Sequence, residues 1–254
     1  MKKILIFFST IIILFVSFWF YLDQNYEVPI LMYHSLDKSK MSVSPVVQPQ
    51  NFHQQMNFIK RNGYSVIPFS QYCRLLKGSK PIPRKTIVIT FDDGLKDNLK
   101  AINILDEFGY PATIFIIVGK IGKDNYLAKS DIEFFLTDTE IEIGSHTLSH
   151  AYLPDLDDVS LRKEILRSKS LLGRGFFQDV EIISYPVGGF DERVIEEVKK
   201  GEYLCACTTN RGFSKDLNRF ALRRIKITNR DSGLRLWAKL SGFYNVFKKP
   251  KKPY

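Results

Sequence analysis

Short apolar runs alternate along most of this chain with stretches in which apolar residues recur every three or four positions. Runs of this kind are typical of buried strands, and the longer periodic stretches are typical of amphipathic helices. The runs predict strands at residues 28–35, 64–68, 86–91, 111–119, 141–145, 180–186, 203–209 and 220–227. The periodic stretches predict helices at residues 51–63, 70–78, 95–109, 130–138, 159–173, 191–201 and 232–244.

This alternation of strands and helices predicts an α/β fold with a mostly parallel sheet. One domain of about seven or eight β/α units fits the chain length better than two separate domains. A closed or nearly closed barrel is the expected architecture, and an open doubly wound sheet is the alternative. Both architectures place a functional site at the carboxyl ends of the strands.

The first residues of the chain depart from this pattern. Residues 4–22 (ILIFFSTIIILFVSFWFYL) carry no charge and follow two lysines. About 20 apolar residues span a bilayer, whereas a signal peptide has a shorter apolar core and a small-residue cleavage site, which the sequence SFWFYLDQN lacks. We therefore predict one transmembrane helix that anchors the chain, with the folded domain outside the cytoplasm. A cleaved signal peptide, and with it a secreted or periplasmic domain, is the alternative.

These patterns divide the chain into a membrane anchor (1–26), a folded domain (27–247) and a basic tail (248–254). The formal net charge is +10, but six lysines lie before the apolar run or in the tail, so residues 4–247 carry only +4. No nucleic-acid-binding motif is present, and we expect no nucleic acid partner. Three cysteines are too few for a disulfide framework, so we expect them to pack in the core. The oligomeric state is not predicted by any of these features.

Two adjacent carboxylates follow a strand that looks fully buried. The motif TFDDG, residues 90–94, places Asp92 and Asp93 directly after the apolar run TIVI. Burying two unpaired charges away from water would cost several kcal/mol or more, so a cation is expected beside them. Side chains alternate between the faces of a strand, so the two carboxylates can converge only where the strand ends. Gly94 permits the turn that this convergence needs.

Two of the four histidines of the chain follow another predicted strand. In IEIGSHTLSH, residues 141–150, His146 and His150 are four positions apart. If the segment coils after the strand, both imidazoles can bind one ion. Two histidines and one carboxylate form a three-ligand set that leaves positions open for water and substrate.

These motifs resemble those of the polysaccharide deacetylase family, also called the NodB-homology or carbohydrate esterase family 4 enzymes. TFDDG is similar to the first family motif, SHTLSH to the second and SYPVGG (184–189) to the third. The segment PILMYHSL near the start resembles the branch that deacetylates poly-β-1,6-N-acetylglucosamine. The resemblance covers roughly residues 28–228.

The resemblance implies a deformed (β/α)7-type barrel and metal-assisted hydrolysis of an N-acetyl group. Asp93, His146 and His150 would hold the metal. Zinc is the expected metal, and cobalt or nickel would satisfy the same ligands. Asp92 would be the general base that takes a proton from the metal-bound water. In the third motif, Tyr185, Pro186 and Val187 would form the oxyanion and substrate-binding segment, with the backbone N–H of Val187 as the oxyanion donor.

The sequence departs from the family pattern in two places. Many members use a histidine near the C-terminus to protonate the leaving amine, but no histidine follows His150. In the poly-β-1,6-N-acetylglucosamine branch the histidine of the N-terminal YH motif takes this role, which implies His34 as the general acid. Many members also carry an arginine before the proline of the third motif to orient the base. That arginine is missing here, and Arg223 or Arg224 is the candidate replacement for orienting Asp92.

The expected function is hydrolysis of N-acetyl groups in an N-acetylglucosamine-containing polysaccharide of the envelope or the extracellular space. The β-1,6-linked polymer is the first choice, and peptidoglycan, chitin-like chains and a lipid-linked amino sugar are alternatives. A non-catalytic glycan-binding module on the same fold is a second hypothesis, which the intact acidic and histidine residues disfavour. An iron oxygenase also uses two histidines and one carboxylate, but the β/α alternation differs from the antiparallel scaffold usual for that class.

Overall fold

A computed structural model describes residues 2–24, 26–37, 45–211, 217–242 and 244. The strands are β1 Ile30–Tyr33, β2 Ser65–Val66, β3 Thr86–Phe91, β4 Ala112–Ile116, β5 Ile141–Ser145, β6 Ile182–Ser184, β7 Cys205–Cys207 and β8 Ile225–Lys226. The helices are α1 Lys2–Gln24, α2 Pro49–Arg61, α3 Phe69–Lys77, α4 Asn98–Phe108, α5 Lys129–Asp138, α6 Asp158–Arg162, α7 Ser168–Phe176, α8 Glu192–Lys200 and α9 Gly233–Leu240. Shorter turns are the 3₁₀ helices η1 Val118–Lys120, η2 Leu153–Asp155 and η4 Pro186–Gly188, and the π-helical turn η3 Lys163–Arg167.

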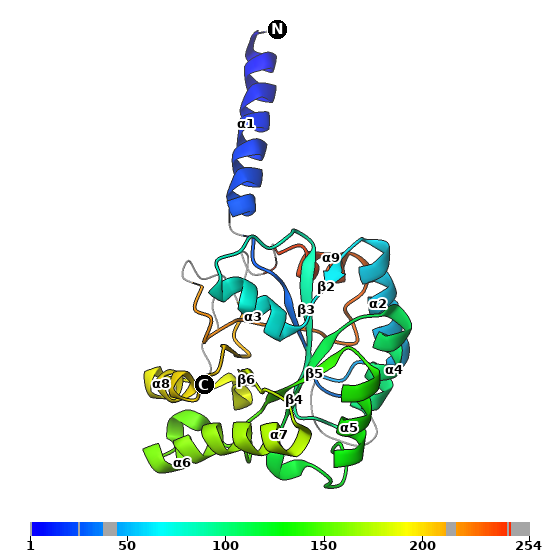
Figure 1. Ribbon diagram of the computed structural model, residues 1–254. Coiled ribbons are helices and arrows are strands. Elements are labelled where there is room, and N and C mark those ends of the chain that lie inside the picture. Colours follow the sequence, from blue (N-terminus) through cyan, green and yellow to red (C-terminus); the bar gives the residue numbers. More distant parts are fainter. Residues whose placement is uncertain (1, 25, 38–44, 212–216, 243, 245–254) are drawn as a thin grey trace.

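The strands form one parallel sheet in the order β7-β6-β5-β4-β3-β1-β8, and the short β2 pairs with β3 beside it. The sheet curls, and a bridge between Cys207 and Leu222 connects the segment before β8 to the far edge strand β7. The predicted α/β class and parallel sheet are therefore confirmed, in the form of a curled half-barrel. Helices from the intervening segments surround it (Figure 1).

Apolar residues on the two faces of the sheet form two separate cores. Ile87 and Ile89 of β3 belong to the larger core, which lies between the sheet and helices such as α4, α5 and α8. Val88, between them, belongs to the smaller core together with Phe69 and Cys73 of α3. Successive strand residues point to opposite faces, so this alternation is what a strand covered on both sides requires. All three cysteines are buried and free, as expected.

The predicted helix 159–173 is interrupted. It begins as α6, passes through the π-helical turn η3 and continues as α7. A π-helical turn inserts one extra residue per turn, which hydrophobic periodicity does not reveal, and such turns often occur at functional sites. Leu161, Ile165 and Leu172 are buried, as their spacing predicts, and Glu164 is buried with them.

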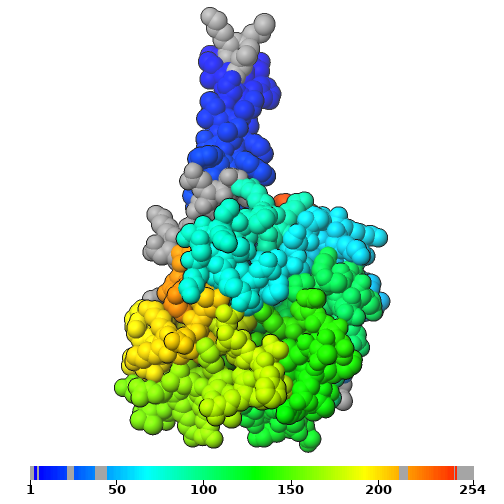
Figure 2. All heavy atoms as spheres, viewed as in Figure 1, coloured from blue at the N-terminus to red at the C-terminus, as the bar shows by residue number. Residues whose placement is uncertain are grey.

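The N-terminal helix α1 forms over the uncharged run and projects from the folded domain (Figures 1 and 2). Within the described part of the chain, no helix has the length and apolarity that a membrane span requires. The predicted transmembrane anchor is therefore not supported. The elements from β1 to α9 fall inside the predicted domain 27–247. The predicted basic tail 248–254 lies outside the described residues.

Candidate metal centre and active site

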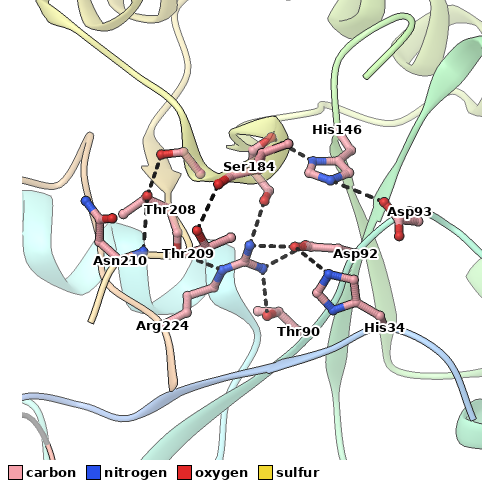
Figure 3. Close-up of polar contacts among 12 residues, drawn as sticks. His34, Thr90, Asp92, Asp93, His146, Ser184, Thr208, Thr209, Asn210 and Arg224 are labelled. Atoms are coloured by element: carbon pink, nitrogen blue, oxygen red, sulfur yellow. Dashed lines mark hydrogen bonds and ion pairs between the residues drawn. The ribbon is translucent and has the colours of Figure 1, made fainter. Parts of the chain in front are cut away.

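The two carboxylates of TFDDG diverge from the strand in a left-handed turn. Asp92 is buried, and its backbone N–H donates to the carbonyl oxygen of Tyr33 on β1 (3.0 Å). Asp93 and Gly94 follow with φ of 75° and 68°. A Cβ on residue 94 would stand 2.9 Å from the side chain of Ile116, so both the backbone and the space favour glycine here. The turn lets Asp92 point towards Arg224 and His34 while Asp93 points towards His146 (Figure 3).

The two histidines come together on the loop that follows β5. Thr147 and His150 adopt left-handed backbone conformations, with φ of 66° and 68°, which coil the segment back towards β3. Asp93 Oδ1 lies 3.5 Å from His146 Nε2 and 3.6 Å from His150 Nε2. One donor atom from each of the three residues falls within 4.8 Å of the others. The predicted ligands are thus assembled at one point.

This donor set fits a divalent metal of the zinc type. The Nδ1 of His146 lies 2.8 Å from the carbonyl oxygen of Ser184, which can only accept, so Nδ1 carries the proton and Nε2 presents its lone pair towards Asp93. Three convergent acceptor atoms are what a cation would satisfy.

Asp92 is held by a fully buried arginine. Arg224, from the segment that leads into β8, donates from Nη1 and Nη2 to the two carboxylate oxygens at 2.7 and 2.6 Å. Its remaining N–H groups donate to Thr90 Oγ1, Ser184 Oγ and the carbonyl oxygen of Thr208. All five donors of the guanidinium are therefore used. Burial by itself would raise the pKa of Asp92, but the charge of Arg224 holds it well below the usual range.

The sequence leaves Arg223 and Arg224 as alternatives, and the structure selects Arg224 as the group that orients Asp92. Arg224 is 132 positions from Asp92, and no local pattern distinguishes it from its neighbour. Arg224 lies just before β8, outside the third motif. Ser184, which occupies the third motif here, accepts a hydrogen bond from the same guanidinium.

His34 lies on the same rim, after β1. Its Nε2 is 4.0 Å from Asp92 Oδ2, and its backbone carbonyl accepts from the side chain of Asn98 at 2.7 Å. The buried Nδ1 has no hydrogen-bond partner within the described chain. Burial lowers the pKa of His34 more than the nearby carboxylates raise it, so the neutral imidazole is favoured at neutral pH. His34 and Asp92 therefore lie side by side in the lining of the same cavity.

The third motif contributes one of its three predicted residues to the cavity. Tyr185 is buried in the core, where its hydroxyl donates to the carbonyl oxygen of Phe220 at 2.9 Å. Pro186 is also buried, and neither residue lines the cavity. Val187 does line it, in the turn η4, with a φ of 58°. Thr209 Oγ1 donates to the carbonyl oxygen of Val187 (3.0 Å) and fixes this turn.

A residue that the sequence does not single out supports the metal loop. The carboxylate of Glu164 accepts hydrogen bonds from the backbone N–H groups of Leu148 (2.9 Å) and Ser149 (2.8 Å) and from the Ser149 hydroxyl (2.7 Å). Glu164 is 8% exposed and lies in the π-helical turn η3. It therefore holds two of the residues that connect His146 to His150. Glu164 is three positions after the buried Leu161, so helical spacing places it at the edge of the buried face.

We expect Glu164→Ala to weaken metal binding by about 10- to 100-fold, because residues that orient metal ligands typically have effects of this size. The change leaves two part-buried N–H groups and one hydroxyl without their acceptor, so the His150 side of the loop loses its position. Glu164→Gln should lie between alanine and wild type, since its amide oxygen still accepts. Affinity is measured by competition with a chromophoric chelator, with the exposed Glu196→Ala as the control. Equal affinities for Glu164→Ala and the control would contradict this role.

One cavity of about 780 Å³ contains these groups. Its lining includes the metal triad, Asp92, His34 and Arg224, together with residues that no catalytic step requires, such as Lys120, Tyr126 and Lys226. Every predicted catalytic and metal-binding residue therefore opens into one space at the carboxyl ends of the strands. Hydrolysis of an amide needs water activation, proton transfer and oxyanion stabilisation, and the groups for all three surround this cavity.

Comparison with known proteins finds that this chain is similar to polysaccharide deacetylases. The family model described as polysaccharide deacetylase matches residues 79–206. A Bacillus subtilis (strain 168) protein named as a polysaccharide deacetylase is 33% identical over 219 residues, which is 85% of this chain and 77% of that protein. The Staphylococcus aureus poly-β-1,6-N-acetyl-D-glucosamine N-deacetylase (strain MSSA476) is 24% identical over 61% of this chain, and the match spans 58% of that enzyme.

A solved structure shows the same architecture. The Streptococcus pyogenes deacetylase PplD, in complex with acetate, superposes with a TM-score of 0.78 at 25% identity, over 84% of this chain and 97% of that chain. The matched family segment contains TFDDG, both histidines and the third motif, and these motifs contribute Asp92, Asp93, His146, His150 and Val187 to the cavity lining. From the sequence relatives, the fold and this shared site, we conclude that the chain belongs to the polysaccharide deacetylase family of enzymes.

Proposed function

We propose that this enzyme removes N-acetyl groups from an N-acetylglucosamine-containing polysaccharide of the envelope or extracellular space. We further propose that it does so with a divalent metal, zinc in the first instance, held by Asp93, His146 and His150. The observation that carries the proposal is that this triad opens into the same cavity as the arginine-bound Asp92 and His34. A glycan-binding module without activity would have no use for a buried, oriented base beside a metal site.

The division of roles follows from the surroundings of each group. When bound, the metal would polarise the amide carbonyl and activate water for attack. Asp92 stays ionised because Arg224 compensates its charge, so it is ready to accept a proton from the attacking water. The same compensation makes Asp92 a weak base, which holds the proton only briefly. His34, 4.0 Å away and neutral, can take the proton and deliver it to the leaving nitrogen.

The oxyanion that forms on the carbonyl needs a donor besides the metal. We propose the backbone N–H of Val187 for this role, since Val187 is the residue of the third motif that lines the cavity. The left-handed conformation of Val187 and the bond from Thr209 hold the turn in one shape. A preorganised donor of this kind contributes to catalysis because it needs no reorganisation during the reaction.

Among the candidate glycans, the β-1,6-linked chain is the first to test, because the Staphylococcus aureus relative is named for that polymer. Peptidoglycan, chitin-like chains and lipid-linked amino sugars follow. All of these substrates are found outside the cytoplasm or at its membrane, so we propose that the domain acts outside the cytoplasm.

The test is acetate release by the full-length protein from β-1,6- and β-1,4-linked N-acetylglucosamine oligomers and from peptidoglycan. We expect release that a chelator abolishes and that added zinc or cobalt restores. His150→Ala should lose both bound metal and activity, whereas His53→Ala, on the surface of α2, should keep both. Acetate release that survives complete metal removal would overturn the metal assignment. A metal-loaded protein that releases no acetate from any of these glycans would overturn the substrate class.

A further inference from the structure

Three cationic side chains line the cavity outside the catalytic group. Lys120 ends the turn η1 after β4, Arg211 follows β7, and Lys226 is the last residue of β8. Lys120 lies over the ring of Tyr126, with 5.6 Å from Nζ to the ring centroid. In the described part of the chain, no carboxylate forms an ion pair with any of the three. These cations are therefore available to a ligand in the cavity.

The charges of the cavity do not balance. Among its described lining residues, four lysines and arginines face two carboxylates. Arg224 already compensates Asp92 through two short hydrogen bonds, and a divalent cation at Asp93 would more than compensate the second carboxylate. Among the described residues, nothing compensates the charges of Lys120, Arg211 and Lys226. A concave site lined by one sign of charge focuses its field and raises the local concentration of ligands of the opposite sign.

A neutral N-acetylglucosamine chain offers these cations hydroxyl and carbonyl acceptors but no counter-charge, and a chain that has already lost acetyl groups carries ammonium groups that they would repel. We propose that the preferred substrate is an anionic glycan, with a phosphate or carboxylate substituent on the sugar that loses its acetyl group or on its neighbour. Lys120, Arg211 and Lys226 bind that substituent. This inference rests on the proposed function and changes its order of preference, from neutral β-1,6 chains to acidic polymers.

The test measures kcat/KM of the metal-loaded, full-length protein for three matched oligomers. All have the same linkage and length. One is neutral N-acetylglucosamine, one contains a single lactyl-ether carboxylate, as in N-acetylmuramic acid, and one contains a single sugar 6-phosphate. We expect kcat/KM for at least one acidic oligomer to exceed that for the neutral oligomer by about tenfold at low salt. The two acidic arms distinguish carboxylate from phosphate as the source of the negative charge.

Two further measurements use the ratio of kcat/KM for the acidic and the neutral oligomer. If Lys226 had only a structural role, neither added salt nor its substitution would change this ratio. The advantage of the acidic oligomer should shrink as ionic strength rises from about 0.01 M to about 1 M, because the Debye length falls from about 30 Å to about 3 Å. Lys226→Gln should reduce the ratio of acidic to neutral kcat/KM by roughly two- to fivefold, which is the range for one exposed ion pair. Lys226→Arg should preserve the ratio. The control is Lys77→Gln, an exposed lysine at the end of α3 outside the cavity.

The outcomes separate this inference from the proposed function. Acetate release from the neutral oligomer at a rate equal to or above that from both acidic ones would overturn the anionic preference and leave the deacetylase function intact. Equal ratios for Lys226→Gln and Lys77→Gln would likewise overturn the anionic preference alone. No release from any oligomer by the metal-loaded protein would overturn the proposed function itself.

Discussion

Asp92→Asn is expected to lower kcat by about 10²- to 10⁴-fold, the usual contribution of a positioned general base. Asparagine has almost the same shape, but its amide oxygen cannot hold the proton that leaves the attacking water. Asp93, His146 and His150 are unchanged, so the variant should still bind metal. The measurement is single-turnover acetate release per metal-loaded molecule, which separates loss of chemistry from loss of metal.

The substitution also leaves the buried Arg224 without its counter-charge, so stability must be controlled. Asp231→Asn is the matched control. Asp231 is equally buried, pairs with Lys239 at 2.7 Å and lies outside the cavity lining. It should destabilise the protein while kcat per folded molecule stays near the wild-type value. If Asp92→Asn retained wild-type kcat, or if the two variants lost activity equally, Asp92 would not be the base.

The strands and the residues at their ends could be predicted because their signals are local. The run TIVITF matches β3, IEIGS matches β5, and each is followed at once by its functional residues. Gly94 was expected where the chain turns after β3, and it has a positive φ. Parallel strands bring their carboxyl ends to one edge, so residues that are distant in sequence but share that position were expected to meet.

The supporting residues could not be predicted because their contacts are long-range or depend on irregular backbone. Arg224 reaches Asp92 only because β8 pairs with β1, and β1 pairs with β3. Glu164 reaches the histidine loop from a π-helical turn that leaves no mark on the apolar spacing. Tyr185 follows a strand and precedes a functional turn, yet its side chain points into the core. Motif position alone does not determine which way such a side chain points.

Arg224→Met is expected to destabilise the protein by about 3–5 kcal/mol, the usual cost of removing one partner of a buried ion pair. Methionine fills similar space against Phe115, whose ring centroid lies 5.6 Å from the guanidinium carbon, so the packing loss should be small. The cost arises because Asp92 remains ionised, buried and without its two short hydrogen bonds. Arg224→Lys keeps the charge but loses the two-pronged geometry, and we expect an intermediate effect. Urea unfolding measures the free energy of unfolding of the wild type, Arg224→Met and Arg224→Lys.

The double variant Arg224→Met/Asp92→Asn tests whether the stability lost in Arg224→Met is due to the uncompensated charge of Asp92. If the cost of Arg224→Met comes from the uncompensated carboxylate, removing that charge as well should recover a large part of the lost stability, and the two changes should be strongly non-additive. Additive effects would show instead that Arg224 stabilises the fold through Thr90, Ser184 and Thr208. Strong coupling would mean that the charge of Asp92 is tolerated in the interior because Arg224 compensates it. The ionised base and the packing of β8 against β1 would then depend on the same ion pair.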